Sequence, residues 1–258
     1  MIVSKASSRC IILAVDGSSS QEAAFSTIEM AAAGPIGPHL WAVKLNDVLH
    51  ASFGHELIRR TKSAFPGLAL FCDLKLADVT PTVVNTVRRY SDLVGDLLVT
   101  VSLHASPKAF VALRQSFSKL NIAAMGVPTD WTPEQCCERY GMDPGEAMQR
   151  WVSCAIDQCC DLVNNLLFEP FSHAITSTDM LDVMCEHFST VSRITPGIRD
   201  EWMTKGTQER TTGTADALRA GANLLVMGSQ LTKGNPERDI TPARSQELTA
   251  EQIKAALA

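Results

Sequence analysis

The sequence predicts an α/β protein folded as a single (β/α)8 barrel of the TIM type over residues 1–258. Apolar runs rich in Val, Ile and Leu recur along the chain, and each is followed by an amphipathic segment. Continuously apolar strands that alternate with helices indicate a parallel sheet covered on both faces. Successive runs begin 25 to 33 residues apart, with one larger interval of 40 residues. A strand with its crossover helix takes about 30 residues, so eight such units in 258 residues match a barrel.

The expected strands are short, and each ends at a polar residue or a glycine. They are Ile11 to Val15, Leu40 to Leu45, Leu68 to Leu74, Leu97 to Leu103, Ile122 to Val127, Leu162 to Phe168, Val191 to Thr195 and Leu224 to Gly228. An open, doubly wound sheet is the main alternative, and it normally carries a glycine-rich phosphate turn after its first strand. Residues 16–20 read Asp-Gly-Ser-Ser-Ser, without a G-x-G-x-x-G or a Walker lysine. The barrel is therefore the better prediction.

The long interval follows the fifth run and contains two stretches with helical patterns. These stretches are Pro133 to Arg139 and Pro144 to Gln158. We expect them to form an extra helical segment or lid on one βα loop. A last amphipathic helix is expected over Ser245 to Ala258. No linker rich in Pro, Gly or Ser divides the chain, so one domain is expected.

Composition and charge exclude several classes of protein. The net charge is −5, and no basic run is interleaved with aromatic residues, so nucleic acid is not an expected partner. The apolar run near the N-terminus is too short for a secretory signal, and no segment has the length needed to span a bilayer. We therefore expect a soluble protein of the cytoplasm. The 8 cysteines include no Cys-x-x-Cys, and no metal site is expected.

Charged residues gather at the ends of the first three strands. Asp16 follows the first strand, Lys44 lies in the second, and the third ends with Asp73, Lys75 and Asp78. Catalytic residues of such barrels lie where strands end, at the carboxyl face. On an extended strand, residues two apart project to the same side, so Asp73 and Lys75 are expected to share one space. Alternating charges so close together are commonest at functional sites, although a structural ion-pair network is the alternative.

Other strand ends also carry polar residues. His104 follows the fourth strand, and Thr132 closes the turn after the fifth. Beyond Asp78, Thr80 and Pro81 are typical of a helix N-cap followed by the first helical position.

Six segments together resemble the orotidine 5′-phosphate decarboxylase family. They are Ala14-Val-Asp16, Val43-Lys44, Asp73-Leu-Lys-Leu-Ala-Asp-Val-Thr-Pro-Thr82, His104-Ala-Ser106, Thr195-Pro-Gly-Ile-Arg199 and Gly221-Ala-Asn-Leu-Leu-Val-Met-Gly228. The match spans nearly the whole barrel. Its most specific parts are D-x-K-x-x-D and T-P-G-I-R.

This resemblance implies decarboxylation of orotidine monophosphate to uridine monophosphate, in pyrimidine biosynthesis, without a cofactor. Lys44, Asp73 and Lys75 would be catalytic charges of one chain, while Asp78, with Thr82 beside it, would reach the site of a partner in a homodimer. The residue types suit the reaction, because loss of carbon dioxide leaves negative charge on a ring carbon that an ammonium can stabilise and protonate.

The resemblance also implies a set of substrate-binding residues. Asp16 would bind the ribose hydroxyls and Thr132 the pyrimidine, while Gln208 would approach the phosphate. The remaining predicted contacts come from the ends of the fourth, seventh and eighth strands: His104, Pro196, Gly197, Arg199, Gly228 and Ser229.

The chain departs from the family pattern at two places. Gly228 is followed by Ser229 where the family usually has an arginine paired with the phosphate, and a hydroxyl gives only one neutral hydrogen bond. Arg199, Arg210 or Lys233 could supply the missing charge. The second departure is at position 130, where the fifth-strand turn has an aspartate in place of the more usual small hydroxyl or Glu.

Two other functions are compatible with these residues. A related barrel enzyme could act on a sugar phosphate with Mg²⁺, but such enzymes usually have an acidic residue where Lys44 stands. A non-catalytic nucleotide-binding barrel is the other alternative, and Ser229 favours it.

Overall fold

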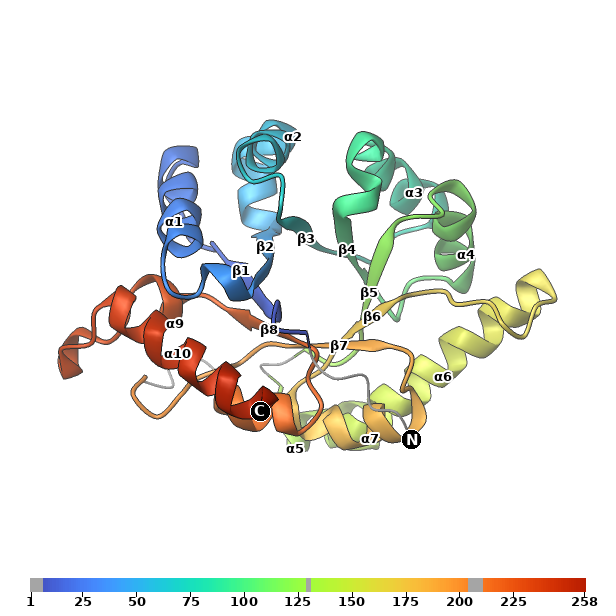
Figure 1. Ribbon diagram of the computed structural model, residues 1–258. Coiled ribbons are helices and arrows are strands. Elements are labelled where there is room, and N and C mark those ends of the chain that lie inside the picture. The colour runs from blue at the N-terminus through green and yellow to red at the C-terminus, as the bar shows by residue number, and fades with distance from the viewer. Residues whose placement is uncertain (1–6, 129–130, 204–210) are drawn as a thin grey trace.

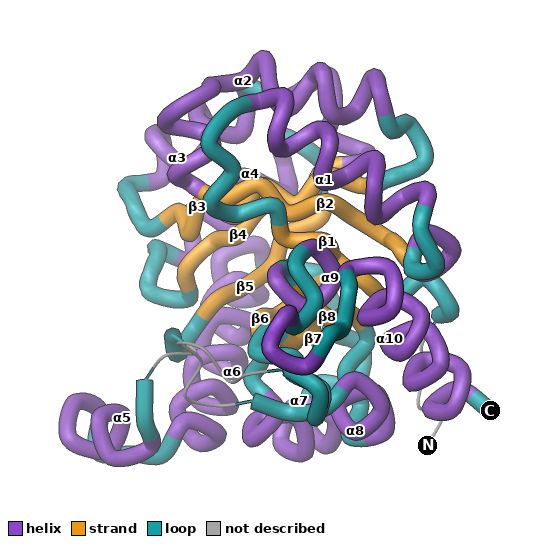
Figure 2. Tube along the Cα trace, turned by 90° about the vertical axis from the view of Figure 1, so that its left-hand side faces the viewer, coloured by secondary structure: helices purple, strands orange, loops and turns teal. Residues whose placement is uncertain are grey.

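The computed structural model describes residues 7–128, 131–203 and 211–258. The strands pair in chain order, all parallel, and β8 closes on β1, which confirms the predicted barrel (Figures 1 and 2). The strands are β1 (Ile11–Ala14), β2 (Leu40–Asn46), β3 (Ala69–Leu76), β4 (Leu97–Ser102), β5 (Asn121–Met125), β6 (His173–Ile175), β7 (Ser192–Thr195) and β8 (Leu224–Met227).

Alternation along the strands separates two apolar layers. Ile12, Phe71 and Leu98 belong to a small buried cluster that fills the barrel. Ile11 and Leu13, on either side of Ile12, belong to the larger cluster that also contains buried residues of the helices. Successive side chains of a strand point to opposite faces. Both faces are therefore buried, which explains the continuously apolar runs in the sequence.

Helices surround the strands (Figure 1). The α-helices are α1 (Gln21–Ala33), α2 (Asp47–Ala64), α3 (Thr80–Arg88), α4 (Pro107–Ser116), α5 (Pro133–Tyr140), α6 (Pro144–Val163), α7 (Leu181–His187), α8 (Thr214–Arg219), α9 (Ser229–Thr232) and α10 (Pro242–Leu257). Short 3-10 turns are η1 (Gly37–His39), η2 (Ser91–Asp96), η3 (Thr178–Met180) and η4 (Pro236–Arg238). In the described ranges, no helix combines the length and the apolar character that a membrane crossing requires.

The two helices predicted after the fifth strand are both present. Thr132 and Asp143 begin α5 and α6, and each forms a capping box with the residue three positions later. Gly141 ends α5 with a left-handed φ of 70°. α6 packs between α4 and α7 as the covering helix, and α5 contacts α6 at the periphery of the barrel (Figure 2). α5 is thus the extra helix, and α10 confirms the predicted helix near the C-terminus.

The predicted position of the sixth strand is wrong. Leu162 to Phe168 begins in the last turn of α6, which ends at Val163 and is followed by the C-cap Asn164 with a left-handed φ of 49°. Leu166 and Leu167 then lie in a loop with 87% and 88% of their surface exposed. The true strand, β6, has only three residues and begins with a histidine. An apolar run alone cannot separate a helix end from a strand, and this strand is too short to give a clear signal.

The predicted start of α3 also differs by one residue. Val79 is the N-cap, and no side chain caps this helix. Asp78 lies just before it and accepts a hydrogen bond from the Val79 amide through Oδ1 at 2.6 Å. Thr80 is therefore the first helical residue rather than the cap.

Candidate active site

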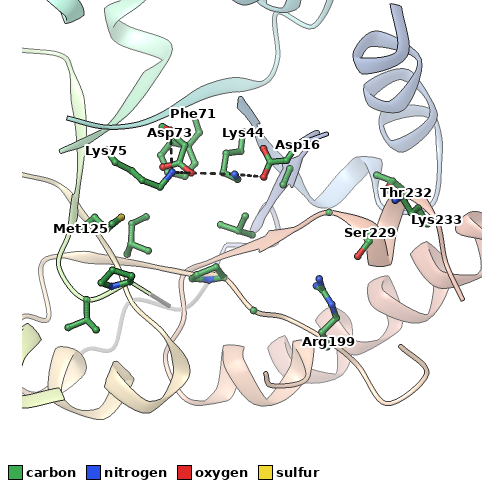
Figure 3. A pocket seen from close by; sticks show the side chains of 18 residues that line it. Asp16, Lys44, Phe71, Asp73, Lys75, Met125, Arg199, Ser229, Thr232 and Lys233 are labelled. Carbon is green, nitrogen blue, oxygen red and sulfur yellow. Dashed lines mark hydrogen bonds and ion pairs between the residues drawn. The ribbon is translucent and has the colours of Figure 1, made fainter. Parts of the chain in front are cut away.

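A cavity of about 430 Å³ opens at the carboxyl ends of the strands. Its wall includes Asp16, Lys44, Asp73 and Lys75 from the first three strands and their ends. The opposite part comes from residues that follow β7 and β8 (Figure 3). The cavity thus occupies the face where barrels of this kind carry their catalytic residues.

Four charges form a chain along one side of this cavity (Figure 3). The Lys44 Nζ lies 2.6 Å from Asp16 Oδ2 and 3.3 Å from Asp73 Oδ2. The Lys75 Nζ lies 3.1 Å from the same Asp73 oxygen. The order of charges is therefore carboxylate, ammonium, carboxylate, ammonium, and the sum is zero. We call these four residues the charge array.

Asp73 is the centre of the charge array. Its burial alone would raise the pKa of its carboxyl group, but Lys44 and Lys75 lower it, and the net effect holds the pKa below its usual value. Thr100, in the middle of β4, adds a hydrogen bond by donating from Oγ1 to Asp73 Oδ1 at 2.8 Å. The carboxylate is therefore ionised at neutral pH and cannot rotate freely.

The backbone at Lys75 is unusual. Its φ is 48°, in the left-handed region that a side chain normally avoids. The pairing of β3 with β4 also shifts register between Cys72 and Leu76, as it does at a bulge. Lys75 thus meets Asp73 as predicted, but through a local distortion rather than through regular strand alternation. Such a conformation costs about 1–2 kcal/mol, and it turns the ammonium toward the cavity.

The other end of the cavity carries two positively charged side chains. Arg199 and Lys233 both line it, with the hydroxyls of Ser229 and Thr232 nearby (Figure 3). Arg199 donates from Nη1 to the carbonyl of Ile198 at 2.7 Å. Neither cation forms an ion pair with a carboxylate in the part of the chain that the structure describes.

Burial favours an anionic ligand for Arg199. It lowers the pKa of the guanidinium from its ordinary value because water is partly removed. Among the residues that the structure describes, no carboxylate pairs with this desolvated cation, so an incoming anion would be favoured at this end of the cavity.

The structure separates the predicted site residues into groups. Asp16, Lys44, Asp73 and Lys75 meet as predicted, and so do the residues after β7 and β8, namely Pro196, Gly197, Arg199, Gly228 and Ser229. Gln208 and Arg210 lie outside the described residues.

Four predicted residues do not line the cavity of their own chain. Asp78 and Thr82 are exposed at the start of α3. His104 instead packs its ring against Trp151, with centroids 4.7 Å apart. Thr132 uses its hydroxyl to cap α5, accepting from the amide of Gln135. His104 and Thr132 were expected near the substrate because they follow strand ends, but the extra helix and its aromatic neighbours engage both of them.

Sequence reasoning missed the apolar wall of the cavity. Phe71, Met125, Val127, Ile175 and Val226 line it. These side chains give a flat ligand an apolar surface next to the charge array. The alternation of side chains along a strand could have indicated this wall. Phe71, for example, lies two residues before Asp73 on the same strand, and residues two apart point to the same face. Thr100 was a further signal, being a polar residue inside the apolar run of β4.

The chain matches a known protein family over most of its length. Residues 10–240 match the model of the orotidine 5′-phosphate decarboxylase / HUMPS family. The chain is 33% identical over 199 residues to an orotidine 5′-phosphate decarboxylase of Caulobacter vibrioides, covering 76% of this chain and 81% of the relative. It is 30% identical over 233 residues to the enzyme of that name from Caulobacter sp. strain K31, covering 89% and 92%.

Solved structures show the same fold. The orotidine 5′-phosphate decarboxylase of Lactobacillus acidophilus superposes with a TM-score of 0.69 at 17% identity, over 95% of this chain and 99% of that one. The enzyme of Sulfolobus solfataricus has a TM-score of 0.66 at 16% identity, over 98% and 100%. The enzyme of Methanocaldococcus jannaschii, solved with the inhibitor BMP, has a TM-score of 0.61 at 14% identity, over 95% and 98%.

Proposed function

Because the chain belongs to the orotidine 5′-phosphate decarboxylase / HUMPS family, we propose that it converts orotidine 5′-monophosphate to uridine 5′-monophosphate and carbon dioxide. The observation that carries the proposal is the charge array, in which two ammonium groups alternate with two carboxylates at distances of 2.6 to 3.3 Å. The reaction develops negative charge at one ring carbon, and these fixed charges can stabilise it with little rearrangement.

The proposed chemistry is a direct decarboxylation. The bond between the ring carbon and the carboxylate breaks, carbon dioxide leaves, and the electron pair stays on the ring carbon. Lys75 stabilises this charge through its ammonium and then donates a proton to the carbon, after which it regains a proton from water. Asp73 and Lys44 keep Lys75 in place, since Asp73 joins the two ammonium groups through one oxygen. The array is thus preorganised for the transition state, and no cofactor takes part.

The two ends of the cavity orient the substrate. Arg199 and Lys233 bind the phosphate, the apolar wall accepts the pyrimidine, and Asp16 binds the ribose hydroxyls. Binding energy from the phosphate, remote from the reacting carbon, then holds the ring against Lys75 and contributes to the rate. Ser229 adds a neutral hydrogen bond only, so among the described residues Arg199 and Lys233 carry the charge at this end.

We propose a homodimer whose sites are completed by the partner chain. Asp78 and Thr82 lie outside the cavity of their own chain, at the exposed start of α3. A carboxylate beyond the strand end can extend into a neighbouring subunit, where it would add a further negative charge beside Lys75.

A sugar-phosphate enzyme of the same family is the second candidate, because the matching family model covers HUMPS proteins as well. Those enzymes stabilise an enediolate with Mg²⁺. Here the Lys44 ammonium occupies the space between Asp16 and Asp73, 2.6 and 3.3 Å from their oxygens. A metal ion bound by those carboxylates would have to displace it, so the geometry favours the decarboxylase.

The deciding experiment measures uridine monophosphate formed from orotidine monophosphate by the purified protein. We expect activity in the wild type that persists with a chelator, and its loss in Lys75→Ala and Asp73→Ala. Lys254→Ala, an exposed lysine of α10, is the matched control and keeps full activity. A folded wild type that is as inactive as the two variants indicates a non-catalytic barrel, and activity abolished by the chelator indicates the metal-dependent alternative.

A further inference from the structure

A buried polar network lies behind the cationic end of the cavity. Its centre is Asp200, 5% exposed, and Gln230, which is completely buried. The two residues bond reciprocally: the Asp200 amide donates to Gln230 Oε1 at 3.0 Å, and Gln230 Nε2 donates to Asp200 Oδ2 at 2.5 Å. Thr214 donates to the same carboxylate from its amide and its hydroxyl, at 2.7 and 2.6 Å. Gln230 also donates to Thr249 of α10 at 3.0 Å.

This network joins two segments beyond the end of their β-ladder. The register of β7 with β8 stops at Thr195 and Leu225. The chain then continues from β7 toward Asp200, and from β8 toward Gln230, without further strand pairing between them. The Asp200–Gln230 pair supplies two direct hydrogen bonds between these segments, at the residues next to Arg199 and Ser229. Farther along the same two segments, Asn235 donates from Nδ2 to the Trp202 carbonyl at 2.6 Å.

The pair stands directly next to cavity residues without lining the cavity itself. Arg199 precedes Asp200, and Ser229 precedes Gln230 on α9, which is followed by Lys233. Any shift of the two segments relative to each other would move Arg199 relative to Ser229 and Lys233. A misplacement of about 1 Å can change the performance of a site by about 100-fold.

We propose that Asp200 and Gln230 are positioning residues, whose reciprocal hydrogen bonds hold Arg199 and α9 at the spacing that binds the substrate's phosphate. The inference rests on the proposed function, since it assigns the phosphate of a nucleotide to this end of the cavity. Stability alone does not require such a pair, because apolar residues of similar volume often replace buried polar groups at no loss. Directional bonds between a side chain and a backbone amide also set the relative position of the two segments. The following experiment tests this role.

The experiment compares the binding of uridine monophosphate and uridine by titration calorimetry, because the two ligands differ only in the phosphate. In Gln230→Met, which keeps the chain length but removes both bonds to Asp200, we expect affinity for uridine monophosphate to fall about 10- to 100-fold. Affinity for uridine should stay within about two-fold.

The matched control is Gln246→Met. Gln246 is a buried glutamine that bonds the Leu231 carbonyl of α9 at 3.0 Å but does not contact Asp200. This variant tests whether the loss of any buried side-chain amide near α9 weakens the binding of uridine monophosphate. We expect a comparable loss of thermal stability but an unchanged ratio of the two affinities.

Exchanging the carboxylate and the amide between positions 200 and 230 should restore selective binding of uridine monophosphate. Gln230→Glu alone places two carboxylates together and should abolish the preference for uridine monophosphate. Adding Asp200→Asn lets the amide of residue 200 donate to the new carboxylate, so the preference should return to within a few-fold of wild type.

Two results overturn the inference: an unchanged ratio of affinities in Gln230→Met, or a wild type that binds uridine monophosphate no better than uridine. Failure of the proposed function is a separate outcome, because a wild type that binds the nucleotide selectively but forms no product would contradict the decarboxylation and leave the positioning role supported.

Discussion

Asp73→Asn tests whether the charge array is held together electrostatically. The Asp73 side chain is 13% exposed, and its Oδ2 contacts Lys44 at 3.3 Å and Lys75 at 3.1 Å. Asparagine keeps the shape and can still accept from Thr100, but the array changes from zero to one net positive charge. Removing one partner of a buried ion pair costs about 3–5 kcal/mol. Because Lys75 is 42% exposed and therefore screened by water, we expect a loss near the lower end, about 3 kcal/mol.

The effect should depend on pH in a defined direction. The folded protein lowers the pKa of Asp73, while the unfolded chain has the ordinary value of about 3.9. The stability that the carboxylate contributes is therefore fully present above about pH 4 and is lost as the pH falls through the lower, folded pKa. Asparagine does not titrate. The difference in unfolding free energy between wild type and variant should stay constant from pH 7 to 5 and shrink below about pH 4.

Urea unfolding at a series of pH values measures this difference, provided that the slope with denaturant is the same for both proteins. Asp92→Asn is the control, because Asp92 pairs with Arg59 at 3.1 Å on the surface, with 52% of its side chain exposed. We expect little change there. Equal stability of wild type and Asp73→Asn at pH 7, or a difference that persists undiminished to pH 3, would refute the electrostatic account of the array.

Three further outcomes follow from the same geometry. Thr100→Val removes the hydrogen bond to Asp73, so the pKa of Asp73 should rise and the midpoint of acid unfolding should move to higher pH, with a loss of about 1 kcal/mol at neutral pH. Ser229→Arg should tighten binding of uridine monophosphate in calorimetry, and more strongly in a Lys233→Ala background; no gain in either background would show that another cation already occupies the phosphate site. Lys75→Ala and Asp78→Ala chains should each be inactive but recover about a quarter of wild-type activity when mixed at equal amounts as dimers, and no recovery would place Asp78 outside the partner's site.

The strand ends were the most predictable part of the molecule. Asp16, Lys44 and Asp73 could be assigned to one face because each follows or ends an apolar run, and parallel strands of a barrel deliver their ends to one side. His104 and Thr132 also follow strand ends, but neither lines the cavity of its own chain. The His104 ring packs against Trp151 of α6, and the Thr132 hydroxyl caps α5; strand order contains neither contact.

The sixth strand shows the opposite failure. His173–Ile175 has one histidine and two apolar residues, which is too little pattern to recognise in the sequence. It becomes a strand because β5 and β7 pair with it on either side, so the closure of the barrel determines its conformation. Leu166 and Leu167 had the stronger local signal but no neighbouring strand to pair with.

The sequence by itself determined the number and order of the βα units and placed Asp16, Lys44, Asp73 and Lys75 at or near the strand ends, because periodicity and strand ends are local properties of the chain. Only the tertiary structure decided how those residues meet: the left-handed backbone at Lys75, the hydrogen bond from Thr100, and the reciprocal pair of Asp200 and Gln230. These contacts join residues from different strands or distort one strand locally. Their geometry depends on closure of the barrel, and a local pattern of residue types does not specify contacts between residues that are far apart in the sequence.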